Sequence, residues 1–218
     1  MSPLSSPDAP RRDSDGSLRI GPRHASRRLV LLHGWGADAD DLLDLGAELV
    51  GRDVSVVALR APQPHPLGSG RQWYGLQPID WSELPVARSG LRERLLELGE
   101  EVPLQATALL GFSQGAAIGL DVATAAGGGL PLASLIACSG YPHPDWSPDR
   151  PAMEILLTHG QQDPVVPFAA SEAIEQQLRQ AGGRVQRLAF SGGHGIDPDL
   201  FDPMRALLGR GWSGAEPA

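Results

Sequence analysis

The sequence predicts an α/β fold: a mostly parallel sheet with helices on both of its faces, which together make a sandwich of three layers. Two observations predict it. Short apolar runs recur along the chain, as is typical of strands buried on both faces, and the stretches between them can each hold a helix. Parallel strands need crossover connections, which helices supply. In such folds the reactive groups gather beyond the carboxyl ends of the strands.

The first predicted strand is the apolar run RLVLLH at residues 28–33, which ends at Gly34. Further runs of this kind occur at residues 54–59, 107–110, 132–137, 155–158 and 185–189. Because each is separated from the next by a stretch that can hold a helix, the order along the chain is strand, helix, strand.

Two of the intervening stretches show the 3.6-residue period of an amphipathic helix. Most of the charged residues in the first stretch lie off its apolar face, and a pair of glycines at 182–183 ends the second in the expected left-handed cap region. The apolar faces consist of Leu91, Leu95 and Leu98 in the first stretch and of Ile174, Leu178 and Ala181 in the second.

A single domain accounts for most of the chain of 218 residues, since a domain of this length buries a sizeable core without disulfides or metals. The predicted boundaries are a flexible leader at residues 1–27, one domain at 28–212, and a disordered tail at 213–218. The leader mixes Pro, Ser, Asp and Arg and lacks the continuous apolar stretch of a secretory signal, so we expect a cytoplasmic protein. Neither end carries an apolar run long enough to span a bilayer.

Residues 60–85 interrupt the alternation of strands and helices. This segment is rich in Pro and Gly and contains Trp73, Tyr74 and Trp81. Long loops inside compact domains are usually functional, so we interpret the segment as a lid-like loop whose three aromatic residues bind substrate. Simple packing at the edge of the domain is the alternative.

Charge and composition exclude several classes of function. The net charge is −8, whereas a protein that neutralises phosphates with clustered cations has the opposite sign, so nucleic acid is not an expected partner. The 18 cationic residues are all Arg, which excludes a phosphate-binding P-loop lysine, a Schiff-base lysine and a Ser-Lys dyad. The single cysteine, Cys138, is interpreted as a small core residue. No zinc-like spacing of Cys and His occurs, and we expect no metal and no cofactor.

The strand at 107–110 leads into the sequence GFSQG at residues 111–115, with Ser113 at its centre. A serine on a sharp turn between a strand and a helix needs glycines on either side, because side chains there would clash. The following residues fit a helix, whose positive N-terminal end favours a developing oxyanion. In a chain with 27 glycines a GxSxG pattern also arises by chance, so its place after a strand is what makes it informative.

The order of two later residues strengthens the assignment of Ser113 as a nucleophile. Asp163 follows the strand at 155–158, and His194 follows the strand at 185–189, which is the order Ser, acid, His of hydrolases with this turn. We assign His194 as the general base and Asp163 as the acid that fixes its tautomer and stabilises the imidazolium. A turn-forming Asp-Pro and a loop histidine are the alternatives for the two residues taken singly.

An oxyanion hole requires two backbone N–H groups. We assign them to Gln114, after the nucleophile, and to Trp35, in the glycine-containing loop after the first strand. The histidines at strand ends, His33 and His159, are interpreted as structural. For the others, His24, His65 and His143, solvent exposure is expected.

With these motifs the chain resembles the phospholipase/carboxylesterase family, which includes bacterial carboxylesterases and acyl-protein thioesterases of the α/β-hydrolase fold. The resemblance covers most of the chain from Arg28 onward. It rests on LHGWG at 32–36, RAP at 60–62, GFSQG at 111–115, HG at 159–160, DPVVP at 163–167 and GHG at 193–195. It implies an esterase or thioesterase for short to medium acyl chains or lysophospholipids, with Trp35 and Gln114 at the oxyanion positions and a homodimer as one assembly.

Two positions depart from the family pattern. The family usually has Leu at the position of Trp35, and commonly has Asp at the position of Gly75. A bulky Trp35 would narrow the acyl pocket or stack on the ester, so the acyl-chain preference stays open. The predicted function is a serine hydrolase of small-molecule acyl esters or thioesters. The alternatives are a peptidase or other acyl hydrolase on the same fold, and a ligand-binding protein without activity.

Overall fold

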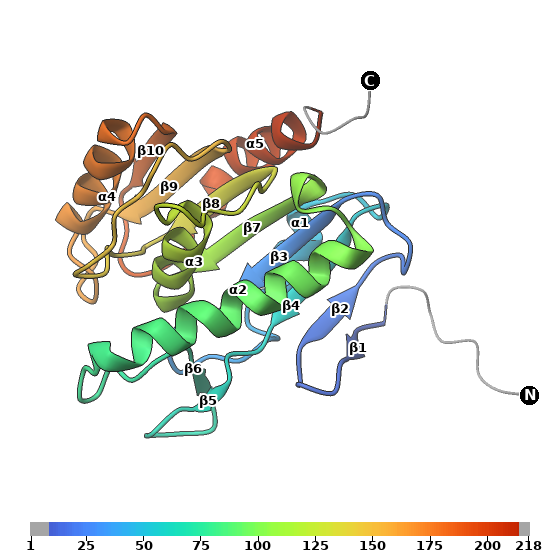
Figure 1. Ribbon diagram of the computed structural model, residues 1–218, viewed down its shortest axis with the longest axis horizontal. Helices are drawn as coiled ribbons and strands as arrows, with labels where there is room; N and C mark the ends of the chain where they lie inside the picture. Colours follow the sequence, from blue (N-terminus) through green and yellow to red (C-terminus); the bar gives the residue numbers. More distant parts are fainter. Residues whose placement is uncertain (1–8, 214–218) are drawn as a thin grey trace, which may run out of the picture.

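The computed structural model describes residues 9–213, and within them the main sheet has eight strands in the order β1-β2-β4-β3-β7-β8-β9-β10 (Figure 1). From β4 to β10 in this order neighbouring strands run parallel, whereas β2 pairs with β4 and β1 with β2 in antiparallel fashion. The strands of the main sheet are β1 (Arg11–Arg12), β2 (Leu18–Ile20), β3 (Arg28–Leu32), β4 (Ser55–Leu59), β7 (Thr107–Phe112), β8 (Ser134–Cys138), β9 (Glu154–Gly160) and β10 (Arg184–Phe190). The mostly parallel sheet that the sequence predicts is confirmed.

Helices cover both faces of this sheet. On one face α2, α3 and α4 pack in a core with Val30, Leu109 and Leu135, and on the other α1 and α5 pack with Leu31 and Leu110. Alternate residues of each strand point to opposite faces, which is why both faces of the apolar strands need a cover. The helices are α1 (Leu43–Leu49), α2 (Leu84–Glu101), α3 (Gln114–Thr124), α4 (Ala169–Gln180) and α5 (Phe201–Ser213), with short 3-10 turns at Trp81–Glu83, Leu104–Ala106 and Pro198–Leu200.

The two amphipathic helices predicted from the sequence are confirmed as α2 and α4. Leu91, Leu95 and Leu98 are buried on α2, as is Ile174 on α4. Gly182 ends the latter helix with a φ of +81°. The pattern did not reveal α1 and α5, the helices of the opposite face.

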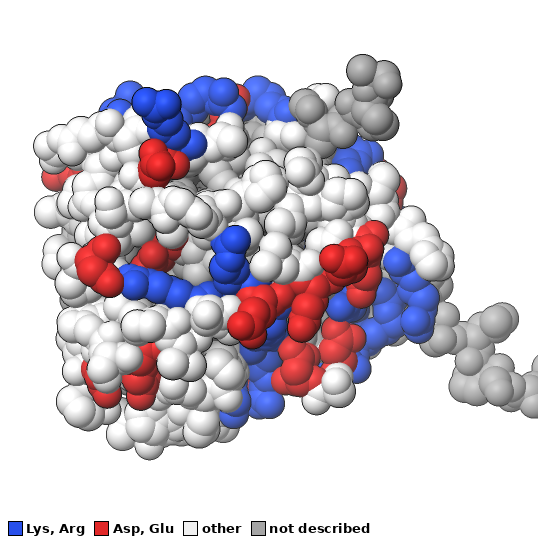
Figure 2. Space-filling view, in the orientation of Figure 1, with Lys and Arg blue, Asp and Glu red and all other residues white. Residues whose placement is uncertain are grey.

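The predicted flexible leader is wrong for residues 9–27, because β1 and β2 extend the main sheet there. β2 pairs with β4 from Leu18 to Ile20. Arg19 forms ion pairs with Asp13 at 2.6 Å and with Glu101 of α2 at 2.7 Å. Figure 2 shows acidic and basic side chains next to one another where the C-terminal half of α2 meets the first two strands. Exposed pairs of this kind contribute little, so pairing of the backbone is the main attachment. The rest of the predicted leader, and the predicted tail after residue 213, lie outside the described residues.

The segment at 60–85 is partly ordered into a small hairpin. β5 (Gln63–Pro64) pairs with β6 (Arg71–Gln72), and Trp73 and Tyr74 after it are buried in the core. The strand pairing and the two buried aromatic residues therefore hold most of this segment on the domain. A lid-like role stays a prediction for the exposed part of the segment. Within residues 9–213, none of the helices is both long and apolar enough to cross a bilayer.

Two adjacent leucines of α2 offer a test of this packing. Leu95 is fully buried and Leu96 is 43% exposed. We expect Leu95→Ala to lower the free energy of unfolding by about 2–5 kcal/mol, because a cavity replaces the lost contacts. Leu96→Ala, the matched control, should change it by less than about 0.5 kcal/mol. Urea unfolding followed by circular dichroism measures both, and equal effects would contradict the assigned burial.

Candidate active site

Ser113 lies on the sharp turn between β7 and α3, with a φ of 53° and a ψ of −116°. A non-glycine residue with positive φ is strained and persists only where its surroundings enforce it. Here the N–H of Ser113 donates to the carbonyl of Cys138 on the neighbouring strand at 2.8 Å. A Cβ on Gly115 would lie 2.2 Å from the carbonyl oxygen of Leu32, so only glycine lets α3 pack this closely on β3.

The loops after β7, β9 and β10 bring the three predicted triad residues together. His194 Nε2 lies 3.0 Å from Ser113 Oγ, and His194 Nδ1 lies 2.7 Å from Asp163 Oδ2. Parallel strands place their carboxyl ends at the same edge of the sheet, which explains how residues 31 and 81 positions apart meet. A hydroxyl, an imidazole and a carboxylate thus form one hydrogen-bonded chain.

Asp163 is held as an ionised acceptor at the end of this chain. Its Oδ1 accepts the N–H groups of Val165 and Val166 at 2.8 and 2.9 Å, while Oδ2 accepts from His194. Burial acts to raise the pKa of Asp163, but the hydrogen bonds from His194 and the two amides outweigh it and lower the pKa below its ordinary value. His159 Nε2 lies 3.3 Å from the same Oδ2 and 2.9 Å from the Val166 carbonyl, as suits the structural role predicted for it.

The loop after β3 lies directly beside the nucleophile. A Cβ on Gly34 would lie 3.5 Å from the Cβ of Ser113. His33 is buried and fixes the loop: its Nδ1 contacts the Gly34 carbonyl at 2.8 Å and its Nε2 accepts the Ala61 N–H at 3.1 Å. Burial lowers the pKa of His33, so the imidazole is neutral and structural, as predicted.

The two predicted oxyanion residues sit at the start of α3 and in the loop after β3. The N–H groups of Trp35 and Gln114 take part in none of the turn and loop backbone hydrogen bonds of residues 9–213. The Trp35 side chain is held on the hairpin, where its Nε1 donates to Gln72 Oε1 at 2.8 Å and its ring meets that of His65 edge to face. These two contacts fix the position of the Trp35 indole, the side chain that stands where the family usually has Leu.

The three aromatic residues predicted to bind substrate differ in exposure. Trp73 and Tyr74 are 2% and 0% exposed, so most of their surface packs in the core, although Trp73 also lines a pocket with Leu91 and Arg94 of α2. Their contact with substrate stays a prediction. The indole N–H of Trp73 donates to the His33 carbonyl at 2.9 Å. Trp81 is 37% exposed, and its substrate contact stays a prediction.

The burial of Cys138 and of three further histidines tests what the sequence predicts for them. Cys138 is fully buried, which confirms it as a core residue, and burial raises the pKa of its thiol to about 12. His24 is exposed as predicted, and His65 is half-buried. The predicted exposure of His143 is wrong: this side chain is buried and hydrogen-bonded to Asp121. A charged residue, Asp121, in the middle of the mostly apolar and fully buried helix α3 is the sequence signal that could have revealed the pair.

No group of three or more His, Cys, Asp or Glu side chains suited to a metal ion occurs in residues 9–213.

A doubly covered parallel sheet with a serine elbow and an acid and a histidine on later loops defines the class of α/β-hydrolases. The phospholipase/carboxylesterase family model matches residues 20–208, and the chain belongs to this family. It is an esterase-type hydrolase.

Relatives of known structure or curated sequence agree with this assignment. Esterase YpfH of Escherichia coli K12 is 32% identical over 184 residues, which cover 79% of this chain and 78% of that protein. Acyl-protein thioesterase 1 of Neurospora crassa is 27% identical over 160 residues, covering 62% and 63%. The crystal structure of esterase PE8 superposes with a TM-score of 0.77 at 29% identity over 87% of this chain and 95% of that one. The Bacillus cereus carboxylesterase, at 22% identity over 89% and 93% of the two chains, shares the fold with a TM-score of 0.75.

The close approach of α3 to β3 can be tested with two glycines. Gly115→Ala places a methyl group against backbone carbonyls. We expect the free energy of unfolding to fall by several kcal/mol, which is among the largest effects of single substitutions. Gly90→Ala on α2, where an added Cβ would have no atom within 4 Å apart from its own stretch of helix, is the matched control and should raise stability by about 0.5–1 kcal/mol. Thermal unfolding compares them, and a Gly115→Ala protein as stable as the parent would contradict this geometry.

Proposed function

We propose that this esterase-type hydrolase cleaves carboxylic esters or thioesters with short to medium acyl chains, lysophospholipids among the candidates, through an acyl-enzyme on Ser113. The observation that carries the proposal is the hydrogen-bonded chain Ser113–His194–Asp163, with contacts of 3.0 and 2.7 Å. A serine hydroxyl becomes an effective nucleophile when an adjacent, correctly oriented base accepts its proton.

Acylation uses these groups in turn. As Ser113 Oγ bonds to the acyl carbon, its proton passes to His194 Nε2 and the carbonyl electron pair moves onto oxygen. The N–H groups of Trp35 and Gln114 and the positive end of α3 stabilise that oxyanion. When the carbonyl reforms, the bond to the leaving group breaks, and His194 returns its proton to the departing alcohol or thiol. Asp163 stabilises the imidazolium between the two transfers without taking the proton.

Deacylation repeats these steps with water as the nucleophile. His194 removes a proton from water as the oxygen attacks the acyl carbon, and the same N–H groups stabilise the second oxyanion. The bond to Ser113 Oγ then breaks, the serine regains its proton from His194, and the carboxylic acid leaves. The two halves together consume one ester or thioester and one water and release one carboxylic acid and one alcohol or thiol, so the reaction balances.

Two alternatives are separated by simple assays. A peptidase uses the same triad, so rates on matched p-nitrophenyl ester and p-nitroanilide substrates decide between ester and amide cleavage. A binding protein without activity would fail to react with a fluorophosphonate probe, which labels only an activated serine. The homodimer and the cytoplasmic location expected from the sequence stay predictions.

Replacing the nucleophile gives the first test. We expect Ser113→Ala to lower kcat/KM for p-nitrophenyl butyrate by roughly 10⁴- to 10⁶-fold, because no oxygen remains to form the acyl-enzyme. Ser89→Ala, an exposed serine on α2, is the matched control and should leave the rate unchanged. Equal turnover by Ser113→Ala and the parent protein would refute the catalytic assignment.

The orienting carboxylate gives the second test. Asn at position 163 keeps the size of the side chain but lacks the charge that stabilises the imidazolium and fixes its tautomer. We expect Asp163→Asn to lower kcat by roughly 10⁴-fold with KM little changed. Initial rates on the same ester measure this, and a loss smaller than about tenfold would argue against Asp163 as the triad acid.

A further inference from the structure

A second chain of buried polar side chains lies beside the nucleophile helix and takes no part in the proposed chemistry. Its members are Tyr74 after the hairpin, His143 after β8 and Asp121 on α3, which are 0%, 4% and 4% exposed. Such groups are costly to bury unless each finds a hydrogen-bond partner. Their contacts therefore indicate what the arrangement holds in place.

The contacts form a closed ring that begins and ends on α3. Gln114 Nε2, in the first turn of the helix, donates to the Tyr74 carbonyl at 2.7 Å, and Gln114 Oε1 accepts the Trp73 N–H at 2.9 Å. The Tyr74 hydroxyl lies 2.8 Å from His143 Nε2, and His143 Nδ1 lies 2.6 Å from Asp121 Oδ2. Asp121 stands two turns further along the same helix, so the ring clamps Tyr74 at its carbonyl and at its hydroxyl.

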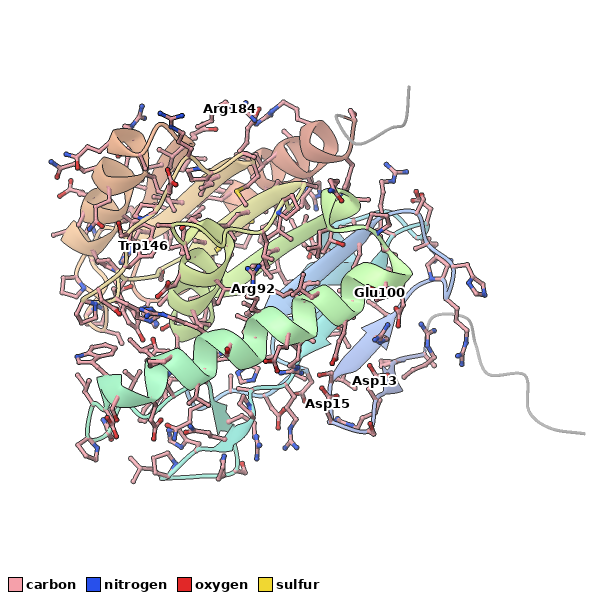
Figure 3. The ribbon with its side chains drawn as sticks, in the orientation of Figure 1. Asp13, Asp15, Arg92, Glu100, Trp146 and Arg184 are labelled. Carbon is pink, nitrogen blue, oxygen red and sulfur yellow. The ribbon has the colours of Figure 1, made fainter. Side chains whose placement is uncertain are left out.

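Further contacts fix the outer part of the ring. The Arg88 guanidinium donates to Asp121 at 2.6 Å and supplies the charge that this buried carboxylate needs. Trp146, labelled in Figure 3, ties the His143 loop to α3: its backbone N–H donates to the His143 carbonyl at 3.2 Å and its indole N–H to Thr124 Oγ1 at 3.0 Å. Burial raises the pKa of Tyr74, so its hydroxyl stays neutral.

The residue at the catalytic end of the ring is Gln114, whose backbone N–H is a proposed oxyanion donor. Its side chain binds the backbone of residues 73–74 at two points, the Trp73 N–H and the Tyr74 carbonyl. We propose that Tyr74, held by His143 and Asp121, is a positioning residue that fixes the first turn of α3 and thereby the direction of the Gln114 N–H. This inference rests on the proposed function, because it assigns the ring a role in stabilising the oxyanion.

The test removes one oxygen from the ring. Tyr74→Phe keeps the aromatic packing and the carbonyl that binds Gln114 but breaks the link to His143. We expect kcat/KM for p-nitrophenyl butyrate to fall by about tenfold, less than the loss on deleting an oxyanion donor, since a donor is displaced and not removed. KM should change by less than about twofold.

A transition-state analogue separates positioning from a general loss of structure. An alkyl trifluoromethyl ketone adds Ser113 Oγ at its carbonyl carbon and places the resulting oxyanion in the hole. We expect its inhibition constant to rise in Tyr74→Phe by the same factor by which kcat/KM falls. Tyr141→Phe is the matched control. The Tyr141 hydroxyl contacts that of Tyr74 at 2.6 Å, and the Tyr141 ring, which Phe keeps, meets the His143 ring edge to face, so loss of this hydroxyl should cost less than about twofold.

A double-mutant cycle tests the route through Gln114. After Gln114→Ala the ring is open, so Tyr74→Phe should cost nothing more, whereas independent effects would add. If Tyr74→Phe does not fold, His143→Gln and His143→Leu replace it. Glutamine and leucine have similar volumes, but only glutamine can still accept a hydrogen bond from the Tyr74 hydroxyl. His143→Gln should therefore retain several-fold more activity than His143→Leu.

The outcomes separate the two proposals. Turnover by the parent protein that Ser113→Ala abolishes supports the proposed function. Given that result, four outcomes would each overturn the positioning role alone. The first two are an unchanged kcat/KM and inhibition constant in Tyr74→Phe, and equal losses in Tyr74→Phe and Tyr141→Phe. The others are additive effects in the cycle, and equal activity of the two His143 variants. A parent protein without Ser113-dependent turnover would overturn the proposed function and this inference with it.

Discussion

Ser113 has a φ of 53°, a conformation that costs a non-glycine residue on the order of 1–3 kcal/mol and persists only where neighbours enforce it. The enforcing contacts come from both sides of the turn. Its N–H is bound to the carbonyl of Cys138 on β8, and Gly115 lets α3 lie against the carbonyls of β3. The position of α3, and with it the layer of helices on that face, depends on this approach. The strain also presents the hydroxyl at the edge of the sheet.

The parallel sheet then determines where the other reactive groups meet. β7, β9 and β10 end at one edge, so loops that are far apart in sequence deliver Ser113, Asp163 and His194 to one place. Each loop is in turn fixed by ordinary backbone contacts. The two amides that bind Asp163 hold the carboxylate ionised and pointed at the histidine. Orientation at this site thus comes from main-chain geometry as much as from side chains.

Much of this arrangement is predictable because it depends on local patterns. Strands buried on both faces must be continuously apolar, so β3 and β7 are visible in the sequence. The two strands β1 and β2 were not, because they are only two and three residues long, three of their five residues are Arg, and they gain their order from the pairing of β2 with β4 and of β1 with β2. The burial of Tyr74 and His143 was equally hidden, since Tyr74 and His143 are 69 positions apart, His143 and Asp121 are 22 positions apart, and these partners meet only in the fold.

The sequence by itself determined the class of fold, the elbow at Ser113 and the order of the three triad residues, because apolar periodicity and glycine spacing are local constraints. Only the tertiary structure decided which polar groups share a buried environment. It showed that Trp73 and Tyr74 face the core and that Asp121, His143 and Tyr74 form one chain of hydrogen bonds. The physical reason is that the burial of a side chain and the partners of its polar atoms are properties of packed surfaces, which segments remote in sequence create together.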